Sequence, residues 1–303
     1  MVGQGGPVQA VSPRGLQDCL NQVERLNIFP TAALKILELS RSPNALLDQL
    51  EEAVALDPVL AARVLKVANA PLFGLRVRIG TLRRALQMLG FDGARNIAIS
   101  LALRGISDGG SEWGERLWRH CEATGWICRV LSRRTRNVNA DEMFVAGLLH
   151  DLGLQLLLIL EPGVSTELLE VHGPDDPELI LAETRHMGFH HGQLGAECLR
   201  RWKLPPYVVQ LVEQHHLHPL HPLQPSTSAR PAQPRLLALL QLADTLADPL
   251  LEGADQGTLE QLALHHPAED DLRIARGAMR ATLELLIKHR GGIVPGASGS
   301  AQG

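Results

Sequence analysis

The chain has 303 residues, a formal net charge of −4 and 45% apolar residues. This composition is typical of a folded globular protein and excludes wholesale disorder, and the net charge excludes a strongly basic nucleic-acid-binding protein. No secretory signal is visible at the start, and the apolar run from Leu152 to Leu160 is far shorter than the roughly 18 residues of a membrane span. Four cysteines without a CxxC pair indicate reduced thiols. We therefore expect a cytoplasmic protein without a membrane segment.

The first hundred residues show a helical period in almost every segment. Leu16, Leu20 and Val23 repeat at i, i+4 and i+7, which places them on one face of a helix. Asp57 and Pro58 form a helix start, with the aspartate as N-cap and the proline at the first helical position. After the first helix, we expect others over about 44–56, 57–69, 81–90 and 92–103.

The rest of the chain has the same helical pattern. Ser111 opens a longer segment that runs to about Thr135, and Asn139 with Glu142 resembles a capping box for a helix through Leu149 and beyond. Further helices are expected over 177–186, 191–202, 206–216, 235–247 and 268–289. Because no alternating strand pattern of useful length is present, we predict an all-α fold.

Composition divides the chain into two helical parts and several irregular ones. We expect a disordered N-terminus over 1–15, an N-terminal helical lobe over 16–108, a second helical lobe over 111–290 and a disordered Gly/Ser/Ala-rich tail over 291–303. Within the second lobe, residues 217–234 hold five prolines and no apolar period. This segment is predicted to be a surface loop.

Charge is unevenly spread along the chain, with a net +3 over residues 1–110 and −7 over the remainder. A basic cluster is formed by Arg76, Arg78, Arg83 and Arg84. It could meet an anionic partner, but a solvated helix face is the simpler interpretation. A net +3 over 110 residues is slight, so nucleic-acid binding by this lobe is the least favoured function.

Several helices each direct a histidine or an aspartate to their apolar face. His120 shares a stripe with Leu117 and Ile127, and the same spacing points further polar residues inward. These are His150 with Asp151 beside it, His215 and Asp244. Such groups are costly to bury unless they are paired or bind a metal. A lone inward histidine is more often a hydrogen-bonded core residue, but the joint pattern favours one or two divalent ions such as Fe, Mn, Zn or Ni.

Sequence strings in a fixed order carry a family resemblance. GLLHDLG at 147–153 looks like the signature of the HD superfamily. The strings around it are DPVLAARVLKVANAPLFG at 57–74, IGTLRRALQMLG at 79–90, LWRHCEATG at 117–125, GFHHGQLGAECLRRWKLP at 188–205, VVQLVEQHH at 208–216 and LLQLADTLA at 239–247. Together they resemble the HDOD (HD-related output domain) family over roughly residues 18–250.

The resemblance implies an N-terminal helical lobe packed on an HD-like helical bundle. Carried over by position, the metal ligands of related HD phosphohydrolases fall on His120, His150, Asp151, His191, His215, His216 and Asp244. His191 matches rather than His190, because it stands four residues before Gly195 as the family pattern requires. Many HDOD proteins resemble bacterial signalling or scaffolding modules without demonstrated hydrolysis, so a complete ligand set does not imply activity.

Two departures from the related HD-GYP phosphodiesterases argue against hydrolysis of cyclic di-GMP. Leu154 stands where those enzymes have a lysine suited to a substrate phosphate, and LHPLHPLQP follows the His-His pair in place of a GYP-type motif. We expect a signal-transduction module that binds a metal and acts through a signalling protein partner. The alternative is a metal-dependent phosphohydrolase for a nucleotide or cyclic dinucleotide, in which Asp151 bridges two metals.

Overall fold

The computed structural model describes residues 15–26, 31–40, 44–69, 78–107, 111–174, 176–216, 233–267, 272 and 274–293. Within these segments the regular structure is helical and contains no strand, which confirms the predicted all-α fold. Two stretches at the ends, residues 1–14 and 294–303, and most of the predicted Pro-rich loop, 217–232, lie outside the described residues.

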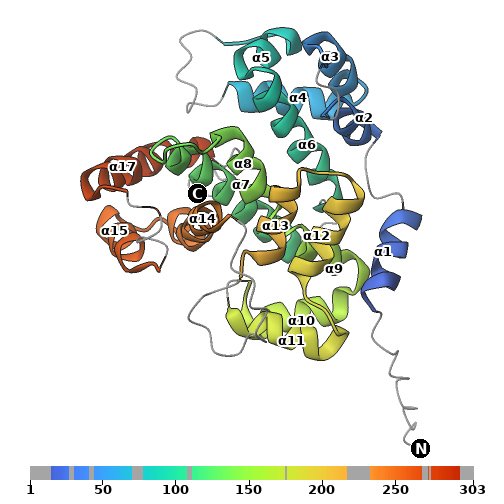
Figure 1. The fold of residues 1–303 in the computed structure, drawn as a ribbon, viewed down its shortest axis with the longest axis vertical. Coiled ribbons are helices and arrows are strands. Elements are labelled where there is room, and N and C mark those ends of the chain that lie inside the picture. The colour runs from blue at the N-terminus through green and yellow to red at the C-terminus, as the bar shows by residue number, and fades with distance from the viewer. Residues whose placement is uncertain are drawn as a thin grey trace, which may run out of the picture.

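Six helices are found among the described residues of the N-terminal part. They are α1 (Leu16–Arg25), α2 (Thr31–Ser40), α3 (Leu47–Ala55), α4 (Pro58–Ala68), α5 (Leu82–Leu89) and α6 (Phe91–Ser107). Figure 1 shows α2 to α5 grouped at one end of the molecule, with α6 leading from them into the main body. The predicted cap of α4 is present, because Asp57 Oδ1 accepts hydrogen bonds from the backbone N–H of Val59 and Leu60 at 2.8 and 3.1 Å.

The second part builds the main body. Its helices are α7 (Glu112–Ser132), α8 (Ala140–Leu149), α9 (Leu152–Leu160), α10 (Pro162–His172), α11 (Pro177–Met187), α12 (His191–Arg201), α13 (Pro206–Gln214), α14 (Pro234–Glu252), α15 (Gln256–His265) and α17 (Arg276–Ile293). Helix α7 is central, since it contacts α8, α14, α17, α6 and α9. Every residue from His120 to Ser132 is buried, as expected of a helix surrounded by others.

Helix α1 packs in a different part of the molecule from the one that we predicted for it. We assigned it to the N-terminal lobe, but α1 packs against α9 and α12 of the main body. Its buried face is the predicted stripe with Leu20 and Val23, and Arg201 of α12 pairs with Glu24 at 2.6 Å. The periodicity identified the buried face but not the helices that cover it.

Some boundaries also differ from those expected. Helix α6 continues through Gly105, which we placed in a linker, and Pro234 begins α14 instead of ending the loop. Helix α17 extends to Ile293, so residues 291–293 belong to a helix and not to the predicted tail. Helices α2, α10 and α15 were not anticipated.

One stretch of the described chain, Glu142–Leu160, is long and apolar enough to cross a membrane, because α8 and α9 follow one another closely. The protein buries 89% of the most apolar part of this stretch in its own interior. Such burial is the pattern of a helix in a protein core.

Glycines allow unusually close helix crossings around the centre of the body. A Cβ on Gly147 of α8 would lie 2.8 Å from Gly125 Cα of α7, and a Cβ on Gly153 of α9 would lie 1.9 Å from the carbonyl oxygen of His191. Gly195 of α12 faces the same α9 backbone. Because only glycine fits at such approaches, these crossings fix the separations of helices that carry the predicted metal ligands.

Candidate metal centre

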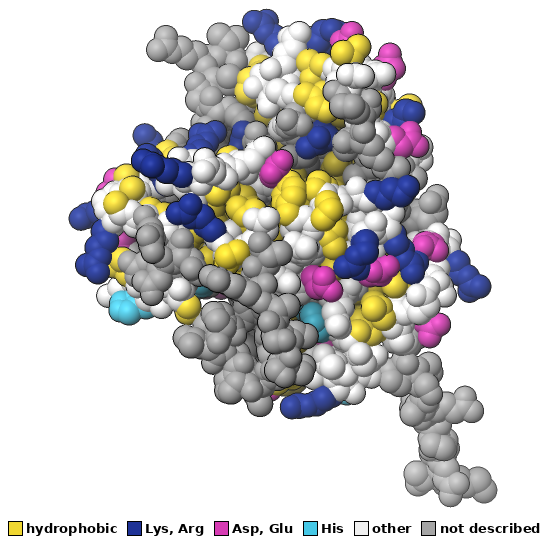
Figure 2. Space-filling view, in the orientation of Figure 1, with side chains coloured by type: hydrophobic (Ala, Val, Ile, Leu, Met, Phe, Trp, Pro, Cys, Tyr) yellow, Lys and Arg dark blue, Asp and Glu magenta, His cyan; other side chains and the backbone are white. Residues whose placement is uncertain are grey.

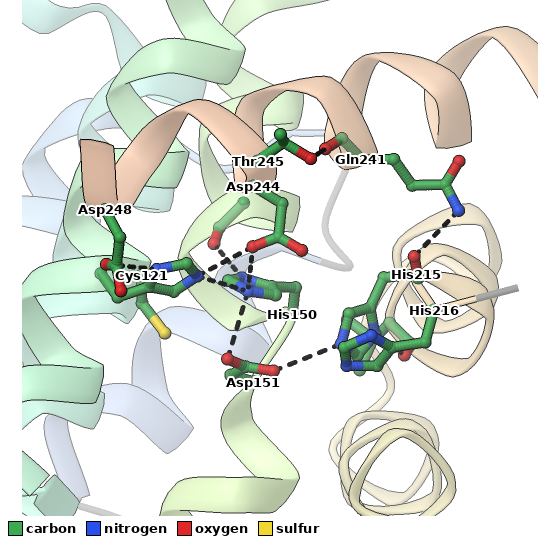
Figure 3. A network of polar contacts seen from close by, with 12 residues as sticks. Cys121, His150, Asp151, His215, His216, Gln241, Asp244, Thr245 and Asp248 are labelled. Carbon is green, nitrogen blue, oxygen red and sulfur yellow. Dashed lines mark hydrogen bonds and ion pairs between the residues drawn. The ribbon is translucent and has the colours of Figure 1, made fainter. Parts of the chain in front are cut away.

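All seven predicted ligands converge at the middle of the main body. His120 comes from α7, His150 and Asp151 from the break between α8 and α9, His191 from the start of α12, His215 and His216 from the residues after α13, and Asp244 from α14. In Figure 3, His150 lies between Asp244 and Asp151, and the pair His215–His216 lies beyond Asp151. The side chains form two adjoining groups.

The first group consists of His120, His150 and Asp244. The two Nε2 atoms are 3.3 Å apart, and Asp244 Oδ1 lies 2.8 Å from His120 Nε2 and 3.2 Å from His150 Nε2. The imidazoles are 1% exposed, and the carboxylate of Asp244 is 15% exposed. Three donor atoms of the types that bind divalent metals therefore meet in a largely buried space.

The second group consists of Asp151, His191, His215 and His216. Their ligand atoms all lie within 4.8 Å of one another. His191 Nε2 is 2.9 Å from His216 Nε2, and Asp151 Oδ1 is 3.2 Å from His215 Nε2 and 3.5 Å from His191 Nε2. Three imidazoles and one carboxylate form a donor set suited to a first-row transition metal.

The carboxylate of Asp151 joins the two groups. Its Oδ2 lies 3.3 Å from His150 Nε2 in the first group, while its Oδ1 faces His215 and His191 in the second. One carboxylate thus offers one oxygen to each ligand group.

Two of the imidazoles are oriented by backbone carbonyls. His150 Nδ1 donates to the carbonyl oxygen of Gly147 at 2.6 Å, and His215 Nδ1 donates to that of Val212 at 2.7 Å. A carbonyl oxygen can only accept, so Nδ1 carries the proton and Nε2 points at the centre as the ligating atom.

Two further imidazoles are oriented by carboxylates that our sequence reasoning missed. His191 Nδ1 donates to Glu183 Oε2 at 2.8 Å, and the backbone N–H of His191 donates to the same oxygen at 2.8 Å. His120 Nδ1 donates to Asp248 Oδ1 at 2.9 Å. The spacing offered a signal, because Asp248 lies one helical turn after Asp244 on the same face of α14. Glu183 likewise follows the buried Leu179 by four residues in α11.

The charges of the centre favour a cation at its middle. Burial opposes protonation of His150, but the carboxylates of Asp151 and Asp244 outweigh it and hold the pKa of His150 well above its ordinary value. Burial would raise the pKa of Asp151, yet His150 and the other imidazoles hold it well below its ordinary value. Burial lowers the pKa of His215 and of His216, which favours the neutral form that can donate to a metal. The residues present fit a bound metal, because the space before His150 Nε2 attracts positive charge.

Leu154, which stands where HD-GYP phosphodiesterases have a lysine, is part of the apolar interior. Leu154 is fully buried and belongs to a small cluster with Leu117, Leu168 and Leu179. This cluster attaches α10 and α11 to the body. Leu154 therefore packs the helix that supplies Glu183 and provides no charge for a phosphate.

The predicted basic cluster is only partly described. Arg76 lies outside the described residues, and Arg78 and Arg84 are exposed. Arg83 pairs with Asp48 at 2.9 Å and with Glu51 at 3.0 Å, which neutralises it. On the face shown in Figure 2, basic side chains lie in separate places among acidic ones, as on an ordinary solvated surface.

An all-helical body with a histidine–aspartate centre at the break between two core helices defines a protein of the HD-like fold class. The chain belongs to the HDOD family, since the HDOD domain matches residues 26–218. This match covers the whole N-terminal helical group after α1 and the main body through α13.

Solved structures share this fold over nearly their whole length. A candidate phosphohydrolase from Shewanella amazonensis SB2B is 23% identical, with a TM-score of 0.68 over 91% of this chain and 96% of that chain. An HDOD domain protein of unknown function from Geobacter sulfurreducens is 22% identical, with a TM-score of 0.67 over 92% of this chain and 96% of that chain. At these identities the likeness concerns the fold alone.

A relative in sequence is an uncharacterised protein from Treponema pallidum (strain Nichols). It is 25% identical over 198 residues, which are 64% of this chain and 38% of that protein. The chain therefore spans well under half the length of this relative.

Proposed function

We propose that this protein is a metal-binding signal-transduction module of the HDOD type. Each of the two ligand groups holds one divalent ion, and Asp151 is shared between them. The module acts mainly through contacts with a signalling protein partner. Its metal centre stabilises the packing of the helices that form the body.

The orientation of the imidazoles is the observation that supports the proposed metal binding most directly. Four of the five histidines have Nδ1 fixed by an acceptor on the protein, from Gly147, Val212, Glu183 and Asp248. In proteins that bind metals through histidine, the second ring nitrogen is held in this way, which fixes the tautomer and the ring plane. Histidines that were buried for packing alone would not be expected to direct their Nε2 atoms to one place.

A second candidate function is metal-dependent phosphohydrolysis of a nucleotide or cyclic dinucleotide. The shared position of Asp151 favours it, because two ions held at one carboxylate can activate a water molecule and polarise a phosphoryl oxygen. Leu154 opposes it, since it packs inside an apolar cluster where a lysine would bind phosphate. We therefore rank this activity below the non-enzymatic role.

The two candidates are separated by measuring bound metal and turnover on the same samples. The purified chain, His150→Ala and Asp151→Ala are analysed for metal and assayed against a panel of phosphomonoesters, nucleotides and cyclic dinucleotides. The control is His265→Ala, which removes an exposed imidazole at the end of α15. We expect metal in the unmodified chain and the control, less in the two site variants, and no turnover in any sample. Turnover that vanishes only in the site variants would establish the phosphohydrolase instead.

A further inference from the structure

A thiol lies beside the first ligand group. Cys121 follows His120 in α7 and is completely buried. Its Sγ, a ring nitrogen of His150 and a carboxylate oxygen of Asp151 all lie within 4.8 Å of one another. In Figure 3, Cys121 lies on the side of His150 opposite to His215. The sulfur is thus within reach of an ion that binds to His150 and Asp151.

A buried amide is directed at this sulfur. Gln155 is 4% exposed in α9, a helix whose other residues are leucine, isoleucine and one glycine. Its Nε2 donates to Cys121 Sγ at 3.5 Å. A polar side chain in such a helix is costly unless its groups are satisfied. An N–H donor at sulfur stabilises negative charge there, which is the form of a cysteine that binds metal.

Another cysteine of the same helix provides the comparison. Cys128 is also completely buried in α7, seven residues after Cys121. Among the residues that the structure describes, Cys121 is the cysteine that falls within a group of metal-binding side chains. Burial in the core therefore accounts for Cys128, whereas Cys121 has the centre on one side and the amide of Gln155 on the other.

We propose that Cys121 is a further ligand of the first ion and that this subsite takes a thiophilic divalent metal such as Zn²⁺, Fe²⁺ or Co²⁺ in preference to Mn²⁺. The inference rests on the proposed metal centre. When the ion binds, the S–H bond breaks, the proton leaves to solvent and a sulfur–metal bond forms, with no change of oxidation state. Gln155 is a positioning residue that holds the sulfur toward the ion.

The test uses Co²⁺ as a spectroscopic probe. The full chain, Cys121→Ser and Cys128→Ser are loaded with Co²⁺ under reducing conditions, and bound cobalt and the near-ultraviolet absorption are measured together. We expect a sulfur-to-cobalt charge-transfer band in the unmodified chain and in Cys128→Ser. The band is absent from Cys121→Ser although this variant still binds cobalt through His150 and Asp151.

A second readout measures metal preference. Cys121→Ser should bind Co²⁺ roughly 10-fold more weakly while its affinity for Mn²⁺ changes little. Cys121→Ala, compared by circular dichroism, separates this effect from a loss of folding. Bound cobalt without the band, or a band that persists in Cys121→Ser, would overturn the inference and leave the metal centre standing. If no cobalt binds to the unmodified chain, both the metal centre and the role of Cys121 are contradicted.

Discussion

At the residue scale, the centre depends on groups that touch the ligands as much as on the ligands themselves. Glu183 and Asp248 each hold the Nδ1–H of one histidine, one carboxylate for each ligand group. A negative acceptor at Nδ1 makes the opposite nitrogen a better donor to a metal. The two carboxylates therefore set both the direction of the imidazole and its basicity.

This arrangement predicts the effect of removing one charge. In Asp248→Asn the side chain keeps its shape and can still accept from His120, but it loses the charge. We expect metal affinity to fall by roughly 10- to 100-fold with the fold retained. Glu252→Gln, the same kind of change one turn later on α14, should have no effect. Equal affinities in Asp248→Asn and the unmodified chain, measured by competition with a chelator, would show that Asp248 does not orient His120.

At the element scale, the ligand-bearing helices are placed by glycine crossings. Gly125 and Gly147 allow α7 and α8 to touch, and Gly153 and Gly195 do the same for α9 and α12. Helix α12 begins with His191, and α9 begins directly after Asp151. The spacing between two ligands of the second group is therefore fixed by backbone contact.

A single methyl group should disturb this spacing. In Gly153→Ala the new Cβ would lie 1.9 Å from the backbone oxygen of His191, and a backbone atom cannot rotate away. We expect the free energy of unfolding to fall by about 1–3 kcal/mol, together with a loss of bound metal. Gly163→Ala in α10, where nothing lies within 4 Å of the new Cβ, is the control and should be neutral or slightly stabilising. Urea unfolding with metal analysis measures both, and a fully stable, metal-loaded Gly153→Ala would refute the close-approach argument.

The N-cap that we predicted at Asp57 stabilises a single helix, α4. Asp57 accepts from two backbone N–H groups at the start of α4. We expect Asp57→Ala to lower the free energy of unfolding by about 1 kcal/mol through the loss of the cap. Glu52→Ala, at an exposed position in α3, should stay within about 0.5 kcal/mol of the unmodified chain. Indistinguishable urea midpoints for the two variants would mean that the cap does not stabilise α4.

At the scale of the whole molecule, the centre links distant parts of the chain. Its ligands come from α7, the α8–α9 break, α12, the end of α13 and α14. Ions bound at the two groups would therefore cross-link most of the main body, and their binding free energy would stabilise the folded state. Of these helices, α8, α9 and α14 contact α7 directly, so ion binding at the centre would be coupled to the stability of the body.

Metal removal should accordingly lower thermal stability. An ion at 100 times its Kd adds about 2.7 kcal/mol to the free energy of unfolding. For a body of this size we expect chelation to lower Tm by roughly 5–10 °C, and added metal to restore it. Asp151→Ala should not respond to the chelator. If Tm stays constant on chelation and on metal addition, the ions do not stabilise the fold.

The fold class was predictable from sequence because helical periodicity and caps are local properties. The same periodicity placed His120, His150, His215 and Asp244 on buried faces, whereas His191 and His216 required the family resemblance. Periodicity states which face is buried but not what covers it. For this reason the packing of α1 on α9 and α12, and the partnership of Glu183 with His191, could not be predicted. Both depend on segments that meet only after the chain has folded.

The central claim is that two ions share Asp151, and metal stoichiometry tests it most directly. The unmodified chain, Asp244→Ala and Asp151→Ala are saturated with Co²⁺ or Zn²⁺, freed of excess ion and analysed for bound metal per chain. Asp244 belongs to the first group alone, while Asp151 faces both. We predict two ions in the unmodified chain, one in Asp244→Ala and none held tightly in Asp151→Ala. An unmodified chain that binds no metal, or equal stoichiometry in all three proteins, would contradict the account.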